Sequence, residues 1–217
     1  MGANGDSMRI VLLGAPGAGK GTAAKMLSDT LNVPHLSAGD LLRENVAGGT
    51  DLGIQAKTFM DSGGLVPDNL VIDMMRERLD RDDCQSGFIL DGFPRTLDQA
   101  EALSGVTDID VVVNIVVPED IIVKRLSGRR VCPSCGAVFN VDNNPPQTNG
   151  VCDRCGGDLI QRDDDQPATI AQRFATYKEK TEPLIAFYAA DGLVREVDSS
   201  GSVEQTEVNT RAALGIE

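Results

Sequence analysis

Short apolar runs alternate along this chain of 217 residues with longer stretches in which apolar side chains recur at helical spacing. The runs predict strands over residues 9–13, 33–36, 87–91, 111–117 and 193–197. The spacing predicts helices after residue 22, near 41–44, over 52–64 and 67–80, around 99, from 118 towards 130, over 168–190 with a break at Pro183, and over 203–214. This alternation predicts an α/β fold, with a parallel sheet covered by helices on both faces.

The first predicted strand ends in glycines, in the stretch Gly14-Ala-Pro-Gly-Ala-Gly-Lys20-Gly-Thr22. Glycines let the backbone wrap closely around an anion, and the next helix points the positive end of its dipole at the same place. Lys20 adds a charge for the β- and γ-phosphates of a nucleotide, and Thr22 adds a hydroxyl near the metal. The alternative is a glycine-rich turn between a core strand and a core helix. The strand–loop–helix context with Lys20 favours a phosphate-binding loop, or P-loop.

A second apolar strand ends in the carboxylate of Asp91, with Arg95 and Gln99 following. Without the P-loop as context, this segment would be interpreted as an ordinary core strand followed by a turn. Because the carboxyl ends of parallel strands meet at one edge of a sheet, we expect Asp91 beside the P-loop, where it holds Mg²⁺ directly or through water.

Two CxxC pairs, Cys132/Cys135 and Cys152/Cys155, lie in a segment rich in Gly, Asn, Pro and Asp. Each pair places two sulfurs on one side of a tight turn, and the two turns complete a tetrahedral thiolate site for zinc. The alternatives are a pair of disulfides or reduced surface cysteines. We expect structural zinc that stabilises a segment too poor in apolar residues to fold alone. Cys84 is isolated, and we expect it to be structural.

The composition indicates a soluble protein, with 41% hydrophobic residues and no run approaching the roughly 20 apolar residues of a membrane span. The start shows no signal peptide, so we expect a cytoplasmic location, with residues 1–7 as a disordered leader. A net charge of -13 argues against broad binding to nucleic acid or anionic membranes. An acidic surface suited to a high-salt cytoplasm is one hypothesis, and an ordinary acidic enzyme is the alternative.

Three further features carry structural expectations. His35, the only histidine, has no obvious partner in the sequence, so we assign it a neutral structural role. Considered without the neighbouring arginines, the acidic run at residues 163–165 is interpreted as a solvated turn at a helix start. Ser37 or Gly39 is expected to cap the helix near residues 41–44.

These motifs together resemble the adenylate kinase family, from residue 9 to residue 214. Gly21 stands where most P-loops have Ser or Thr, which is the form that this family uses. The resemblance implies a P-loop nucleoside-triphosphate-binding fold with a five-stranded parallel sheet, and the long-lid type with structural zinc. It divides the chain into a core (1–36, 67–128 and 166–217), an AMP-binding insertion (37–66) and a lid (129–165).

The resemblance also implies a set of site residues. It assigns catalysis to Lys20, Arg95, Arg125, Arg162 and Arg173. It assigns ATP binding to Gly17, Ala18, Gly19, Lys20, Gly21, Thr22, Arg129, Val138, Phe139 and Gly201. It assigns AMP binding to Ala38, Arg43, Gly64, Leu65, Val66, Gly92, Phe93, Pro94, Arg95, Gln99, Arg162 and Arg173.

The activity implied is the reversible transfer of the terminal phosphoryl group of Mg-ATP to AMP, giving two ADP, by a monomer. Competing readings are a kinase for another nucleoside monophosphate, use of GTP as donor, and a nucleic-acid-binding zinc ribbon joined to a nucleotide switch. Gln99 favours adenine as the acceptor base. The acidic balance and an aromatic content of 4% count against nucleic acid.

Overall fold

The computed structural model describes residues 8–216, so the expectation for residues 1–7 lies outside the described part. A five-stranded parallel sheet has the order β2-β3-β1-β4-β7. Its strands are β1 (Arg9–Leu13), β2 (His35–Ser37), β3 (Phe88–Asp91), β4 (Val111–Val116) and β7 (Val194–Asp198). On one side of the sheet, the hydrophobic core includes residues of α1 (Lys20–Leu31), α6 (Glu119–Gly128), α7 (Pro167–Thr176) and α9 (Val203–Leu214). On the other side, it includes residues of α4 (Asp68–Leu79), α5 (Leu97–Ser104) and α8 (Pro183–Ala189).

Alternation along the strands separates two hydrophobic cores. In β1, Ile10 and Leu12 pack with α1, whereas Val11 and Leu13 pack towards α4 and α8. This period of two is what a strand buried on both faces imposes. The predicted α/β fold with helices on both faces of a five-stranded parallel sheet is therefore confirmed.

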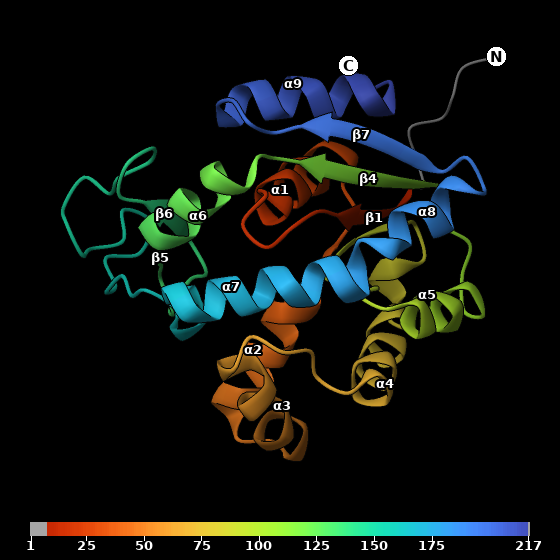
Figure 1. Cartoon of the computed structure of the whole chain (residues 1–217), viewed down its shortest axis with the longest axis horizontal. Coiled ribbons are helices and arrows are strands. Elements are labelled where there is room, and N and C mark those ends of the chain that lie inside the picture. Colours follow the sequence, from red (N-terminus) through yellow and green to blue (C-terminus); the bar gives the residue numbers. More distant parts are fainter. Residues whose placement is uncertain (1–7, 217) are drawn as a thin grey trace.

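Two insertions project from this core (Figure 1). The first consists of α2 (Ala38–Gly48) and α3 (Asp51–Asp61), which pack against each other. Ser37, not Gly39, caps α2, because its hydroxyl accepts a hydrogen bond from the Asp40 N–H at 3.2 Å. The second contains a two-stranded antiparallel sheet of β5 (Arg129–Val131) and β6 (Val138–Asn140), followed by long loops that return to a 3₁₀ turn at Asp163–Asp165.

Some predicted boundaries shift. The helix predicted over 52–64 ends at Asp61, and the one predicted over 67–80 begins at Asp68 with Pro67 at its N-cap. The break predicted at Pro183 begins earlier, in a π-helical turn over Tyr177–Thr181 between α7 and α8. Proline has no N–H for the preceding turn, which agrees with irregular helix geometry just before it. No helix within residues 8–216 is long and apolar enough to cross a membrane.

Candidate active site

The glycine-rich loop joins the carboxyl end of β1 to the start of α1 and takes a backbone course that few other residues allow. Gly14, Gly17 and Gly19 all have positive φ, at 142°, 83° and 106°. A Cβ at Gly17 would lie 2.6 Å from Cγ of Leu126, so a side chain there would clash as well. Helix α1 has no acidic residue in its first turn and no side-chain cap, so its positive end is not neutralised locally.

Lys20 bends back over this loop. Its Nζ donates hydrogen bonds to the carbonyl of Gly14 at 2.7 Å and to that of Ala15 at 3.0 Å. Burial lowers the pKa of Lys20 to about 8, while the negative charge of Asp91 opposes this shift. A bound phosphate would add negative charge beside Nζ and favour the ammonium form.

Asp91 lies beside the loop, as its position at the end of β3 predicts. A Cβ built on Gly21 would be 3.5 Å from its Oδ2. The expectation that His35 lacks a partner is wrong, because Nε2 of His35 lies 3.3 Å from Oδ2 of Asp91. β2 and β3 are neighbouring strands, which brings together two residues far apart in sequence. Burial alone would raise the pKa of Asp91, but the His35 hydrogen bond and the Lys20 charge hold it below its ordinary value.

Arginines from separate elements gather near Lys20 in a chain that is acidic overall. They are Arg43, Arg95, Arg129, Arg162 and Arg173, and each lies close enough to others of the set for their charges to interact. Burial lowers the pKa of both Arg95 and Arg162 to about 10, and neighbouring arginine charges add to the effect. Guanidinium groups are positively charged at neutral pH, so the cluster is a local cationic site suited to phosphates.

Carboxylates from the 3₁₀ turn pair with this cluster. Nε and Nη2 of Arg129 donate to the two oxygens of Asp165 at 2.8 and 2.6 Å. Nη1 of Arg173 lies 2.9 Å from an oxygen of Asp164 and 3.3 Å from one of Asp165. Asp165 has no exposed surface, so its interpretation as part of a solvated turn is wrong. In the sequence, the arginines around the acidic run are the signal that favours arginine–aspartate pairs. Of the three aspartates in the turn, only Asp163 is exposed.

Most of the predicted AMP-binding residues lie in the turn after β3 or between the end of β2 and the start of α4, whereas Gln99 lies in α5, Arg162 before the 3₁₀ turn and Arg173 in α7. Phe93, Val66 and Ala38 are buried, at 2%, 4% and 2% exposure. Nε of Arg95 donates to the Gly92 carbonyl at 2.8 Å, which folds the side chain back over the turn. Arg43 pairs with Asp40, and Arg162 lies 3.8 Å from the same carboxylate. The stretch 64–66 connects α3 to α4.

Gln99 is almost completely buried and hydrogen-bonded at both ends of its amide. Its Oε1 accepts from the backbone N–H of Arg95 at 2.7 Å, and its Nε2 donates to Oδ1 of Asp68 at 2.7 Å. Sequence reasoning missed Asp68, because an acidic residue in the first turn of a helix is ordinary by itself.

Arg125 occupies a different place from the other predicted catalytic arginines. Its guanidinium donates to the carbonyls of Ser199 at 2.7 Å and Gly201 at 3.1 Å, and to that of Ala18 in the P-loop at 3.4 Å. It therefore ties the P-loop to the loop before α9. Of the two predicted lid contacts, Val138 is 51% exposed, whereas Phe139 packs into the cysteine-rich segment.

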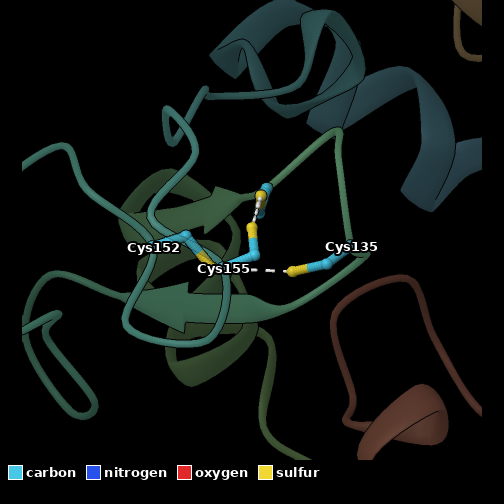
Figure 2. A group of neighbouring side chains, drawn as sticks. Cys135, Cys152 and Cys155 are labelled. Atoms are coloured by element: carbon cyan, nitrogen blue, oxygen red, sulfur yellow. Dashed lines mark hydrogen bonds between the residues drawn. The ribbon is translucent and has the colours of Figure 1, made fainter.

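The four cysteines of the second insertion converge on one point, and Figure 2 shows three of them, Cys135, Cys152 and Cys155, gathered there. All four sulfurs lie within 4.8 Å of one another. The two closest pairs, Cys132 with Cys155 and Cys135 with Cys152, are 3.4 and 3.6 Å apart. A disulfide requires about 2.05 Å, so the disulfide alternative is wrong for this structure.

The cysteine geometry fits a tetrahedral zinc site. Each CxxC pair forms a tight turn, because the N–H of Gly136 donates to the Cys132 carbonyl and that of Gly156 to the Cys152 carbonyl. Four thiolates fill the coordination sphere of zinc, which leaves no position for substrate and indicates a structural ion. The apolar cluster of the segment has only Cys132, Phe139 and Cys152 as buried members, so little else stabilises it.

Comparisons with known proteins agree with this arrangement. A family model described as adenylate kinase matches residues 12–193. The adenylate kinase of Caldicellulosiruptor bescii is 51% identical over 215 residues, covering 97% of this chain and 100% of the relative. That of Methanocella arvoryzae is 49% identical over 212 residues, covering 95% and 98%. That of Archaeoglobus fulgidus is 51% identical over 202 residues, covering 91% and 93%. The chain belongs to the adenylate kinase family.

Proposed function

We propose that the site formed by the P-loop and the arginine cluster transfers the terminal phosphoryl group of Mg-ATP to AMP, giving two ADP. The reaction is reversible and serves the balance of adenine nucleotides. The observation that carries the proposal is the cationic cluster of an acidic chain, in which Arg95, Arg129 and Arg173 lie near Lys20 of the P-loop, and Arg43 and Arg162 lie near those arginines.

The chemistry needs no general base from the protein. An oxygen of the AMP phosphate is already ionised and can attack the γ-phosphate directly. Catalysis then rests on positioning the two nucleotides in line and on stabilising the charge of the transferring group. A guanidinium can bind two phosphate oxygens at once, which suits it to both tasks.

On the donor side, residues 17–22 hold the ATP phosphates through backbone N–H groups and Lys20. Asp91 is the group that would hold Mg²⁺, directly or through water, and its low pKa keeps it ionised for that role. The metal, when bound with ATP, neutralises phosphate charge. Arg129, Val138, Phe139 and Gly201 bind the rest of ATP.

On the acceptor side, Arg43 and Arg95 bind the AMP phosphate. Gln99 reads the adenine edge, within a pocket formed by Ala38, residues 64–66 and residues 92–94. Arg125, Arg162 and Arg173 act on the transferring phosphoryl group. We propose that the arginine–aspartate pairs exchange their carboxylates for phosphates as nucleotides bind.

The domain assignment follows from these roles. Residues 1–36, 67–128 and 166–217 form the core, residues 37–66 the AMP-binding insertion, and residues 129–165 a zinc-stabilised lid. Closure of both insertions excludes water, which would otherwise hydrolyse ATP. We place the enzyme in the cytoplasm, because four thiols poised for zinc need a reducing compartment, and as a monomer, because its net charge opposes self-association.

The test is ADP formation from Mg-ATP by purified protein, with AMP, CMP, UMP and GMP offered separately. We expect turnover confined to AMP. Preference for another acceptor would refute the base-recognition role of Gln99, and absence of transfer to all four would refute the proposed activity. Replacing ATP by GTP in the same assay tests the donor.

A further inference from the structure

The donor and acceptor properties of its two partners fix which way round the amide of Gln99 lies. The backbone N–H of Arg95 can only donate, so the atom of Gln99 that lies 2.7 Å from it is the amide oxygen. The carboxylate of Asp68 accepts, so the atom 2.7 Å from its Oδ1 is the amide nitrogen. At 2% exposure, Gln99 has little water to take the place of either partner.

Asp68 is itself held in place by a second hydrogen bond. Its other oxygen, Oδ2, accepts from the hydroxyl of Thr96 at 3.0 Å. Asp68 is the first residue of α4, and Thr96 is the N-cap of α5, so the carboxylate is fixed between the starts of two helices. Rotation of the Gln99 amide by a half-turn would place its oxygen against this carboxylate and its NH₂ group against the Arg95 N–H.

The orientation matters because an amide can read two kinds of purine. Adenine presents a donor at N6 and an acceptor at N1, whereas hypoxanthine and guanine present an acceptor at O6 and a donor at N1. An amide with one orientation complements adenine, and the same amide turned by a half-turn complements the 6-oxopurines. After its two contacts in the protein, Gln99 retains one N–H and one oxygen lone pair for a base.

We propose that Asp68 is a specificity-determining positioning residue, which fixes the orientation of the Gln99 amide and thereby selects AMP over 6-oxopurine monophosphates. This inference rests on the proposed role of Gln99 in reading the acceptor base. Asp68 acts through Gln99 and has no contact of its own with the base. An acceptor-only carboxylate is suited to the task, because it cannot stabilise the reversed amide.

The test compares AMP with inosine monophosphate, whose base differs from adenine only in the donor and acceptor pattern of this edge. Asp68→Asn keeps the shape but can turn an NH₂ group towards Gln99, which removes the opposition of residue 68 to the reversed amide and leaves only the backbone N–H of Arg95 against it. We expect the ratio of kcat/KM for AMP to that for inosine monophosphate to fall roughly tenfold to a hundredfold. We also expect kcat/KM for inosine monophosphate to rise above the wild-type value, which damage to the fold cannot produce.

Asp73→Asn removes the same charge from an exposed position on the same helix and should leave the ratio unchanged. Asp68→Ala, which removes the acceptor, repeats the ratio measurement should the asparagine variant not fold. A ratio unchanged in the Asp68 variants, or a parallel fall for both acceptors, overturns the inference and leaves the proposed function intact. A wild-type protein that does not use AMP refutes the proposed function instead, and Gln99→Ala with an unchanged ratio refutes the reading of the base by Gln99.

Discussion

Asp165, which is fully buried, accepts two hydrogen bonds from the guanidinium of Arg129 and lies 3.3 Å from Nη1 of Arg173. Arg129 begins β5 of the second insertion and Arg173 belongs to α7, so this carboxylate ties the insertion to a helix beside the sheet. It also neutralises two of the arginines that we place around the phosphates. If these arginines bind nucleotide as we propose, a phosphate displaces this carboxylate, which would link the position of the proposed lid to nucleotide binding.

Removing this carboxylate should destabilise the protein. Asp165→Ala leaves the partly buried guanidinium of Arg129 without its carboxylate partner and leaves Arg173 with Asp164 alone, so we expect the free energy of unfolding to fall by about 3 kcal/mol. Asp163→Ala, in the same turn but exposed, should change it by less than about 0.5 kcal/mol. Urea unfolding of both variants checks this. Equal stability of the two variants would contradict the structural role of the Asp165 pairs.

The sequence predicts the strands, helices and local motifs of this site better than the contacts between its side chains. Strand β1 and helix α9 have the predicted bounds, because alternation and helical spacing are local signals. The P-loop and the CxxC pairs are also recognisable from a few consecutive residues. By contrast, His35 meets Asp91, Arg129 meets Asp165, and Asp68 meets Gln99 across long stretches of chain. Nothing near these residues in sequence identifies their partners, which only the packing of strands and helices brings together.

The positively charged side chains of the proposed site should each be needed for phosphoryl transfer. Lys20→Ala, Arg95→Ala and Arg129→Ala each remove a positive charge that we place against a bound nucleotide, and losing a transition-state contact of this kind typically costs about 3 kcal/mol, or roughly a hundredfold in kcat. Lys25→Ala, on the exposed side of α1, is the matched control and should retain full turnover. Steady-state kinetics with Mg-ATP and AMP measures all four variants. Turnover near the wild-type value in any of the first three would refute the role of that residue.

The low pKa of Lys20 predicts a pH dependence. Burial lowers this pKa to about 8 in the nucleotide-free protein, so the ammonium form is lost as the pH rises through 8. Because kcat/KM reports the free enzyme, kcat/KM for ATP should fall above this pH, whereas kcat should fall at higher pH, since bound phosphates stabilise the charge. The profile of kcat/KM is the measurement. A value constant to pH 10 would be incompatible with a Lys20 contact to ATP.

Removal of zinc should affect stability more than chemistry. The four sulfurs hold a closed structural site, and the segment around them has few other buried apolar residues. Chelation should lower the Tm by roughly 10 °C, which corresponds to a few kcal/mol for a chain of this size. Below the new Tm, turnover should persist, and added zinc should restore the Tm. Cys84→Ser, which lies outside the cluster, should keep its zinc. Immediate loss of turnover in a folded, zinc-free protein would contradict the structural role.

The central claim is that the closed site passes the phosphoryl group to AMP and not to water. It is tested most directly by incubating the protein with Mg-ATP labelled in its γ-phosphate, together with AMP, and separating the products. We predict that the label appears in ADP, with little in inorganic phosphate, and that it does so only when AMP is present. Label recovered mainly as inorganic phosphate, with or without AMP, would contradict the account.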